Sequence, residues 1–64
     1  MITYTVKRPA HGDNSGGIVN YIEGSCISTD TKPDDVANGS IMLEMDTSTL
    51  YMFDENAGTW RAWA

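Results

Sequence analysis

The sequence predicts an all-β protein built on a small antiparallel sheet. Short runs of β-branched, aromatic and large aliphatic residues recur along the chain, separated by polar segments rich in turn-forming residues. No segment has the apolar spacing of a long amphipathic helix. The 64 residues form at most one small domain. Within it, residues 1–17 are expected to provide an N-terminal strand and a glycine-rich loop, and residues 18–64 the β core.

The first half of the chain contains two predicted strands. In residues 2–8, β-branched and aromatic residues alternate with polar ones, the period of two that indicates a strand. Pro9 is expected to end this strand, and residues 10–17 to form a loop. The second strand is expected over residues 18–22 and can resume after Gly24, because a glycine inside a strand pattern indicates a bulge or bend.

Residues 28–38 are expected to form a polar connection. The segment is too short and too polar for a stable helix, although Asp34 and Asp35 could begin one helical turn. Neighbouring carboxylates on an extended chain point to opposite sides, so this pair does not suit general acid–base catalysis. We interpret the two aspartates as solvated loop residues or as a helix N-cap.

Residues 39–63 predict a three-stranded β-meander. Residues 50–53 are apolar on both faces, as expected for its central strand. Turn-forming residues at 46–49 and 54–58 separate this strand from the strands on either side. Gly58 can supply a positive φ angle in the second turn.

The small size of the chain predicts self-association. A chain of this length buries only about 60 % of the surface that its unfolded form exposes. Cys26 is the only cysteine, which excludes an intrachain disulfide, and we interpret it as a small buried apolar residue. With His11 as the only histidine, no metal site and no cofactor are expected. A homo-oligomer, a trimer first and a dimer second, is the remaining source of stability.

The charge distribution argues against nucleic-acid binding. The net charge is −5, and all of it falls in residues 33–64, because the acidic and basic residues of 1–32 cancel. Binding to phosphates depends on lysine and arginine, which this acidic half lacks except for Arg61. No apolar run is long enough for a membrane span. We therefore expect neither a nucleic-acid partner nor a membrane partner.

No catalytic constellation is visible in the sequence. Residues 54–58 resemble the start of a calcium loop but lack the later acidic ligands and the closing glutamate. His11 lies in a glycine-rich loop without an evident nucleophile beside it, and no serine has a nucleophile-elbow context. The protein is therefore expected not to be an enzyme.

Aromatic residues and methionines supply the candidate interaction surface, because these residue types contribute disproportionately to protein interfaces. Trp60 and Trp63 are expected on opposite faces of the last strand, so that one belongs to the core and the other is exposed or covered by a partner. The candidate interaction residues are Tyr51, Phe53, Trp60, Trp63, Met42 and Tyr4.

The order of short motifs over residues 27–60 resembles small proteins encoded in the structural gene clusters of tailed bacteriophages. The segment STDTKPDDVANGS matches the pattern STDxKPxxVxxGS, and the following E-M-D-T, L-Y and W match xxExDTxxxYxxD…W. Ala37 and Ser48 depart from the pattern, where proline and glycine respectively are common. The resemblance implies a non-enzymatic virion protein, a capsid decoration or head-fibre component assembled in the host cytoplasm, whose partners are itself and the capsid or another virion protein.

Two other functions stay open at this level. One is a small phage-encoded inhibitor that binds a host protein through the acidic face. The other is a carbohydrate-binding tip that uses Trp60 or Trp63 as a stacking platform, which requires an exposed indole ring flanked by polar groups.

Overall fold

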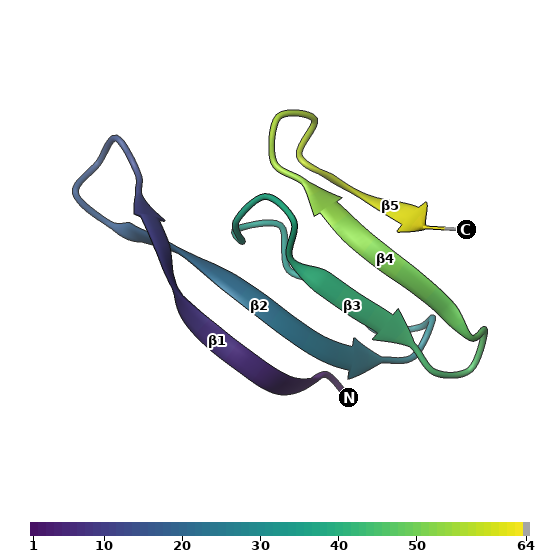
Figure 1. Cartoon of the computed structure of the whole chain (residues 1–64). Coiled ribbons are helices and arrows are strands. Elements are labelled where there is room, and N and C mark those ends of the chain that lie inside the picture. Colours follow the sequence, from purple (N-terminus) through teal and green to yellow (C-terminus); the bar gives the residue numbers. More distant parts are fainter. Residues whose placement is uncertain (64) are drawn as a thin grey trace.

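The protein folds into one five-stranded sheet whose strands follow one another in chain order (Figure 1). The computed structural model describes residues 1–63. Within them no residue is helical, which confirms the predicted all-β class, and no helix that could cross a bilayer is found there. The strands are β1 (Thr3–Gly12), β2 (Ile18–Cys26), β3 (Ile41–Glu44), β4 (Thr49–Asp54) and β5 (Thr59–Trp63).

Strands β2 and β3 are parallel, whereas the other neighbouring strands are antiparallel. An entirely antiparallel sheet was expected, and the difference lies in residues 27–40, the crossover segment. It returns from the end of β2 to the start of β3 across the sheet, as parallel pairing requires (Figure 1). The Ala37 N–H donates to the Asn20 carbonyl at 2.7 Å, and Val36 forms an isolated parallel bridge with Asn20.

The first hairpin is longer than the sequence suggested. Strand β1 continues through Pro9 to Gly12, because β1 is an edge strand and a proline there need not donate to a second neighbour. Strand β2 continues through Gly24 without a break. The two register shifts of the pair lie in β1, one opposite Gly24 between Tyr4 and Val6 and the other between Pro9 and His11. A side chain at Gly24 would collide with the carbonyl oxygen of Thr3, so this close approach of two backbones requires glycine.

The predicted meander is formed by β3, β4 and β5, and its two turns have the same length and a positive φ at the same position. Each turn has four residues between a strand-closing pair, Glu44 with Thr49 and Asp54 with Thr59. The fourth turn residue has a positive φ in both, 55° at Ser48 and 67° at Gly58. The second turn therefore uses glycine as predicted, and the first places serine in a conformation that favours glycine.

The sheet has two unlike faces. On the covered face, Ile22, Cys26, Met42 and Phe53 pack beneath the crossover segment, which adds Val36 to the same buried cluster. Residues alternate between faces along a strand, so their immediate neighbours in β2, β3 and β4 point the other way. We call that second side, away from the crossover segment, the open face.

Candidate interaction surfaces

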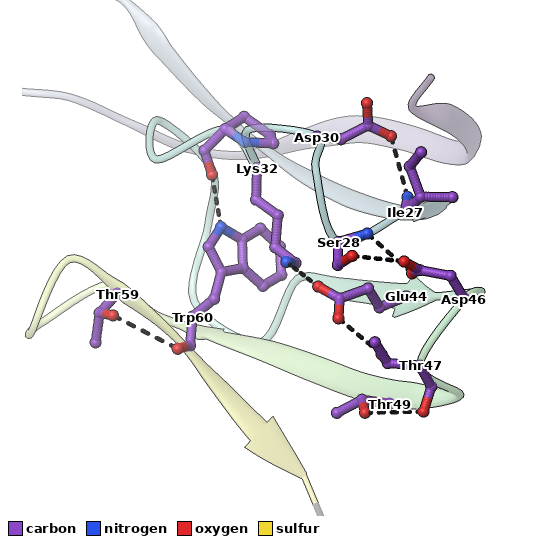
Figure 2. Close-up of polar contacts among 11 residues, drawn as sticks. Ile27, Ser28, Asp30, Lys32, Glu44, Asp46, Thr47, Thr49, Thr59 and Trp60 are labelled. Carbon is purple, nitrogen blue, oxygen red and sulfur yellow. Dashed lines mark hydrogen bonds and ion pairs between the residues drawn. The ribbon is translucent and has the colours of Figure 1, made fainter.

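Two long side chains attach the crossover segment to the covered face (Figure 2). Trp60 on β5 donates its indole N–H to the Pro33 carbonyl oxygen at 2.8 Å. Lys32 extends from the segment in the opposite direction, and its Nζ lies 2.7 Å from Glu44 Oε2 on β3. The two contacts together fix the middle of the segment over the meander.

The Lys32–Glu44 pair is largely buried, with 14 % and 7 % of the two side chains exposed. Burial alone would lower the pKa of Lys32, but the hydrogen bond and charge of Glu44 outweigh it and raise that pKa. Hydrogen bonds from Lys32 and then from Thr47 lower the pKa of Glu44. The Lys32 ammonium also lies 4.3 Å from the ring centre of Tyr51, a cation–π contact. The charged form of the pair is therefore supported by Thr47 and by Tyr51.

Other carboxylates of the chain hold loops in place. Asp46 accepts hydrogen bonds from the backbone N–H and the hydroxyl of Ser28, which joins the first meander turn to the start of the crossover segment (Figure 2). Asp30 accepts from the Ile27 N–H and from the N-terminal ammonium, and these hydrogen bonds contribute to its lowered pKa. The acidic character of the chain is thus used in part for local structure.

Cys26 and His11 occupy very different places. Cys26 is buried in the core, and burial raises the pKa of its thiol, so that less of it is in the reactive thiolate form. His11 lies near the tip of the first hairpin, where its Nε2 is 3.0 Å from Glu55 Oε1 of the second meander turn. Glu55 also accepts from the Asn38 N–H at 3.0 Å. His11 therefore links the first hairpin to the second meander turn through Glu55.

The open face carries a continuous apolar patch over β3, β4 and β5. Three cross-strand pairs build it: Ile41 with Met52, Leu43 with Leu50, and Leu50 with Trp63. Leu43 and Trp63 are exposed over 37 % and 63 % of their surface, and the other three are half-buried. We call these five residues the apolar patch.

Charged side chains at the borders of the open face have partners within the chain. Toward β1, the Arg8 guanidinium lies 5.1 Å from the ring centre of Tyr21, whose hydroxyl donates to Glu23 at 2.6 Å. Toward β5, Arg61 Nε donates to Asp54 Oδ2 at 2.9 Å. These two basic and two acidic groups sum to zero, whereas the whole chain carries −5.

A depression of about 460 Å³ lies beside the patch at the β4–β5 end. Trp63 and Met52 form apolar parts of its lining, and Arg61, Asp54 and Asn38 provide polar groups. An exposed indole ring and hydrogen-bonding groups thus border one hollow.

The structure divides the predicted interaction residues between the two faces. Met42 and Phe53 are buried in the core, Trp60 packs against it at 5.1 Å between ring centres from Phe53, and Tyr51 lies below Lys32. Tyr4 is exposed on β1, and its ring centre is 5.5 Å from the Lys7 ammonium. Of this set, Trp63 alone belongs to the apolar patch. As expected, the two tryptophans lie on opposite faces.

The aliphatic members of the apolar patch were not among the predicted interaction residues. The signal for them is the period of two in residues 41–45, which separates Ile41 and Leu43 from Met42 and Glu44. That pattern distinguishes two faces but does not say which of them the crossover segment covers.

Comparison of the chain with protein-family models, with curated proteins and with solved structures found no match. Among residues 1–63, no three histidine, cysteine, aspartate or glutamate side chains gather as a set of metal ligands.

Proposed function

We propose that this protein is a non-enzymatic structural component of a tailed-phage particle, bound to the capsid exterior as a decoration or head-fibre protein. The single observation that carries its assembly role is the apolar patch, because an exposed contiguous apolar surface on a small protein marks an interaction site. The phage setting follows from the motif resemblance over residues 27–60.

The contacts of the covered face support a structural role. Lys32, Glu44, Asp46 and Trp60 are each engaged in holding the crossover segment or its ends. These four side chains thus hold the sheet and its crossover segment in one fixed arrangement. A rigid sheet with an apolar patch on one face suits a protein that is built into a larger assembly.

Mass spectrometry of purified particles of the encoding phage tests this role. We expect peptides of this chain in stoichiometric amount relative to the major capsid protein, and their loss from particles produced with the gene deleted. Abundant protein in the infected-cell lysate, together with none in purified particles, would reject the virion assignment.

A second candidate function is glycan binding at the depression beside Trp63. An exposed indole ring next to Asp54, Arg61 and Asn38 combines a stacking surface with hydrogen-bonding groups, the arrangement that sugar recognition requires.

Tryptophan fluorescence distinguishes this candidate. Titration with mono- and oligosaccharides should quench or shift the emission of the natural protein, and Trp63→Ala should abolish the response. A response that persists in Trp63→Ala, or none with any sugar up to millimolar concentration, would contradict glycan binding at this site.

A further inference from the structure

We propose that the apolar patch is the contact surface for a second copy of this chain, which packs its own open face against it as a two-sheet sandwich. The inference deepens the proposed assembly role by naming the partner of the open face, and it rests on that role. The closed unit is then a dimer, since the same patch meets itself across a two-fold axis.

The layering of the molecule calls for a second sheet. Small domains are stable when two layers of structure enclose one core. Here the crossover segment supplies a layer on one face only, and the chain is thin, with extents of 36 × 22 × 16 Å. A second sheet on the open face would bury Leu43 and Leu50, as the crossover segment buries Met42 and Phe53 on the covered face.

In such a dimer the apolar patch would form the centre of the interface. The charged side chains at the borders of the open face would then form the polar rim around an apolar centre.

Charge favours a second copy as the occupant. Each chain carries −5, so two copies repel one another over most of their surface. On the open face the charges of Arg8, Glu23, Asp54 and Arg61 cancel within the chain. The open face is thus a surface on which identical acidic chains can meet without like-charge repulsion.

Edge pairing is the competing way to join two copies, and the two edges of the sheet differ. Strand β1 is interrupted by two register shifts and contains Pro9, features that discourage pairing. Strand β5 has neither. The Phe53 N–H and carbonyl bond toward Ser40 and Gly39, so by alternation the Ala62 N–H points to the free edge. Edge pairing through β5 would use that N–H and leave the apolar patch uncovered.

Sedimentation equilibrium and matched variants test the proposal. Leu43→Glu and Leu43→Lys place opposite charges in the patch, and Ile18→Glu places the same glutamate at the first hairpin, on a side chain that is 62 % exposed. Ala62→Pro removes the outward N–H of β5 without removing a bond to β4. Circular dichroism verifies that each variant keeps the β fold.

We expect the natural protein, Ile18→Glu and Ala62→Pro to sediment at twice 7.0 kDa at micromolar concentration. Both Leu43 variants should weaken the dimer at least about 100-fold, because each copy would bury an unpaired charge. A 7.0 kDa monomer in the natural protein would overturn the inference, as would a trimer. Loss of the dimer in Ala62→Pro alone would establish edge pairing instead.

The outcome is independent of the virion test. A dimer that separates only in the Leu43 variants, combined with absence from purified particles, would retain the sandwich and reject the phage role. A monomer that is found in particles would do the reverse.

Discussion

The indole N–H of Trp60 donates to the carbonyl oxygen of Pro33 at 2.8 Å and so joins the last strand to the crossover segment 27 residues earlier. The same indole ring lies 5.1 Å from Phe53 between ring centres. Trp60 therefore connects the sheet to the crossover segment that covers it.

Trp60→Phe keeps an aromatic ring beside Phe53 but removes the donor to Pro33. We expect the free energy of unfolding to fall by about 1–2 kcal/mol, because a part-buried carbonyl loses its partner and the smaller ring leaves space. Urea titration at one fixed protein concentration measures the change. The control, Trp63→Phe, changes an exposed ring and should stay within about 0.5 kcal/mol at a concentration where the chain is monomeric. Equal losses in both variants would contradict this assignment.

Lys32→Met should destabilise the fold by about 3 kcal/mol, because it leaves the Glu44 carboxylate buried without its counter-charge. The double variant Lys32→Met/Glu44→Met should recover most of that loss, since two apolar side chains of similar volume can replace a buried ion pair. Chemical denaturation of the single and double variants measures the coupling between the residues. An additive result would show that the pair is not energetically linked.

Ser48→Gly should stabilise the protein by about 0.5 kcal/mol, because relief of the positive φ slightly exceeds the added flexibility of the unfolded chain. Gly58→Ala should destabilise by about 1 kcal/mol for the converse reason, although a methyl group there meets no neighbour. Ala57→Gly is the control, in the same turn but without a positive φ, and it should be destabilising. Thermal unfolding midpoints decide the signs, and a loss in Ser48→Gly would contradict the argument.

The link between His11 and Glu55 should depend on pH. Hydrogen bonds to the Gly12 carbonyl and to Glu55 raise the pKa of His11 above 6.5, so its stabilising contribution is complete below pH 6.5 and lost as the pH rises through the folded value. His11 lowers the pKa of Glu55 below 4.5, so that contribution is lost as the pH falls through the folded value. The difference in unfolding midpoint between the natural protein and His11→Ala should therefore be largest between pH 4.5 and 6.5. A difference that is constant from pH 5 to 9 would contradict the role of the charged pair.

The meander could be predicted because its information is local. Residues 41–45 alternate, residues 50–53 are apolar on both faces, and the intervening turns have turn-forming residues, so strand order and pairing follow from neighbours in the chain. The opposite placement of Trp60 and Trp63 follows from the same periodicity.

The parallel pairing of β2 with β3 could not be predicted in this way. It depends on contacts between distant residues, Ala37 with Asn20 and Lys32 with Glu44, which no periodicity encodes. The extension of β1 beyond Pro9 was missed because a proline is compatible with a strand only at a sheet edge, and edge position is a property of the whole fold.

The parallel pairing divides the molecule into two hairpin-based halves that meet along a seam of four residue pairs, from Glu23–Ile41 to Cys26–Glu44. Each half closes through short-range turns, whereas the seam closes only after the intervening residues have looped back. The seam is therefore expected to form late in folding. Until it forms, both faces of the meander are exposed to solvent.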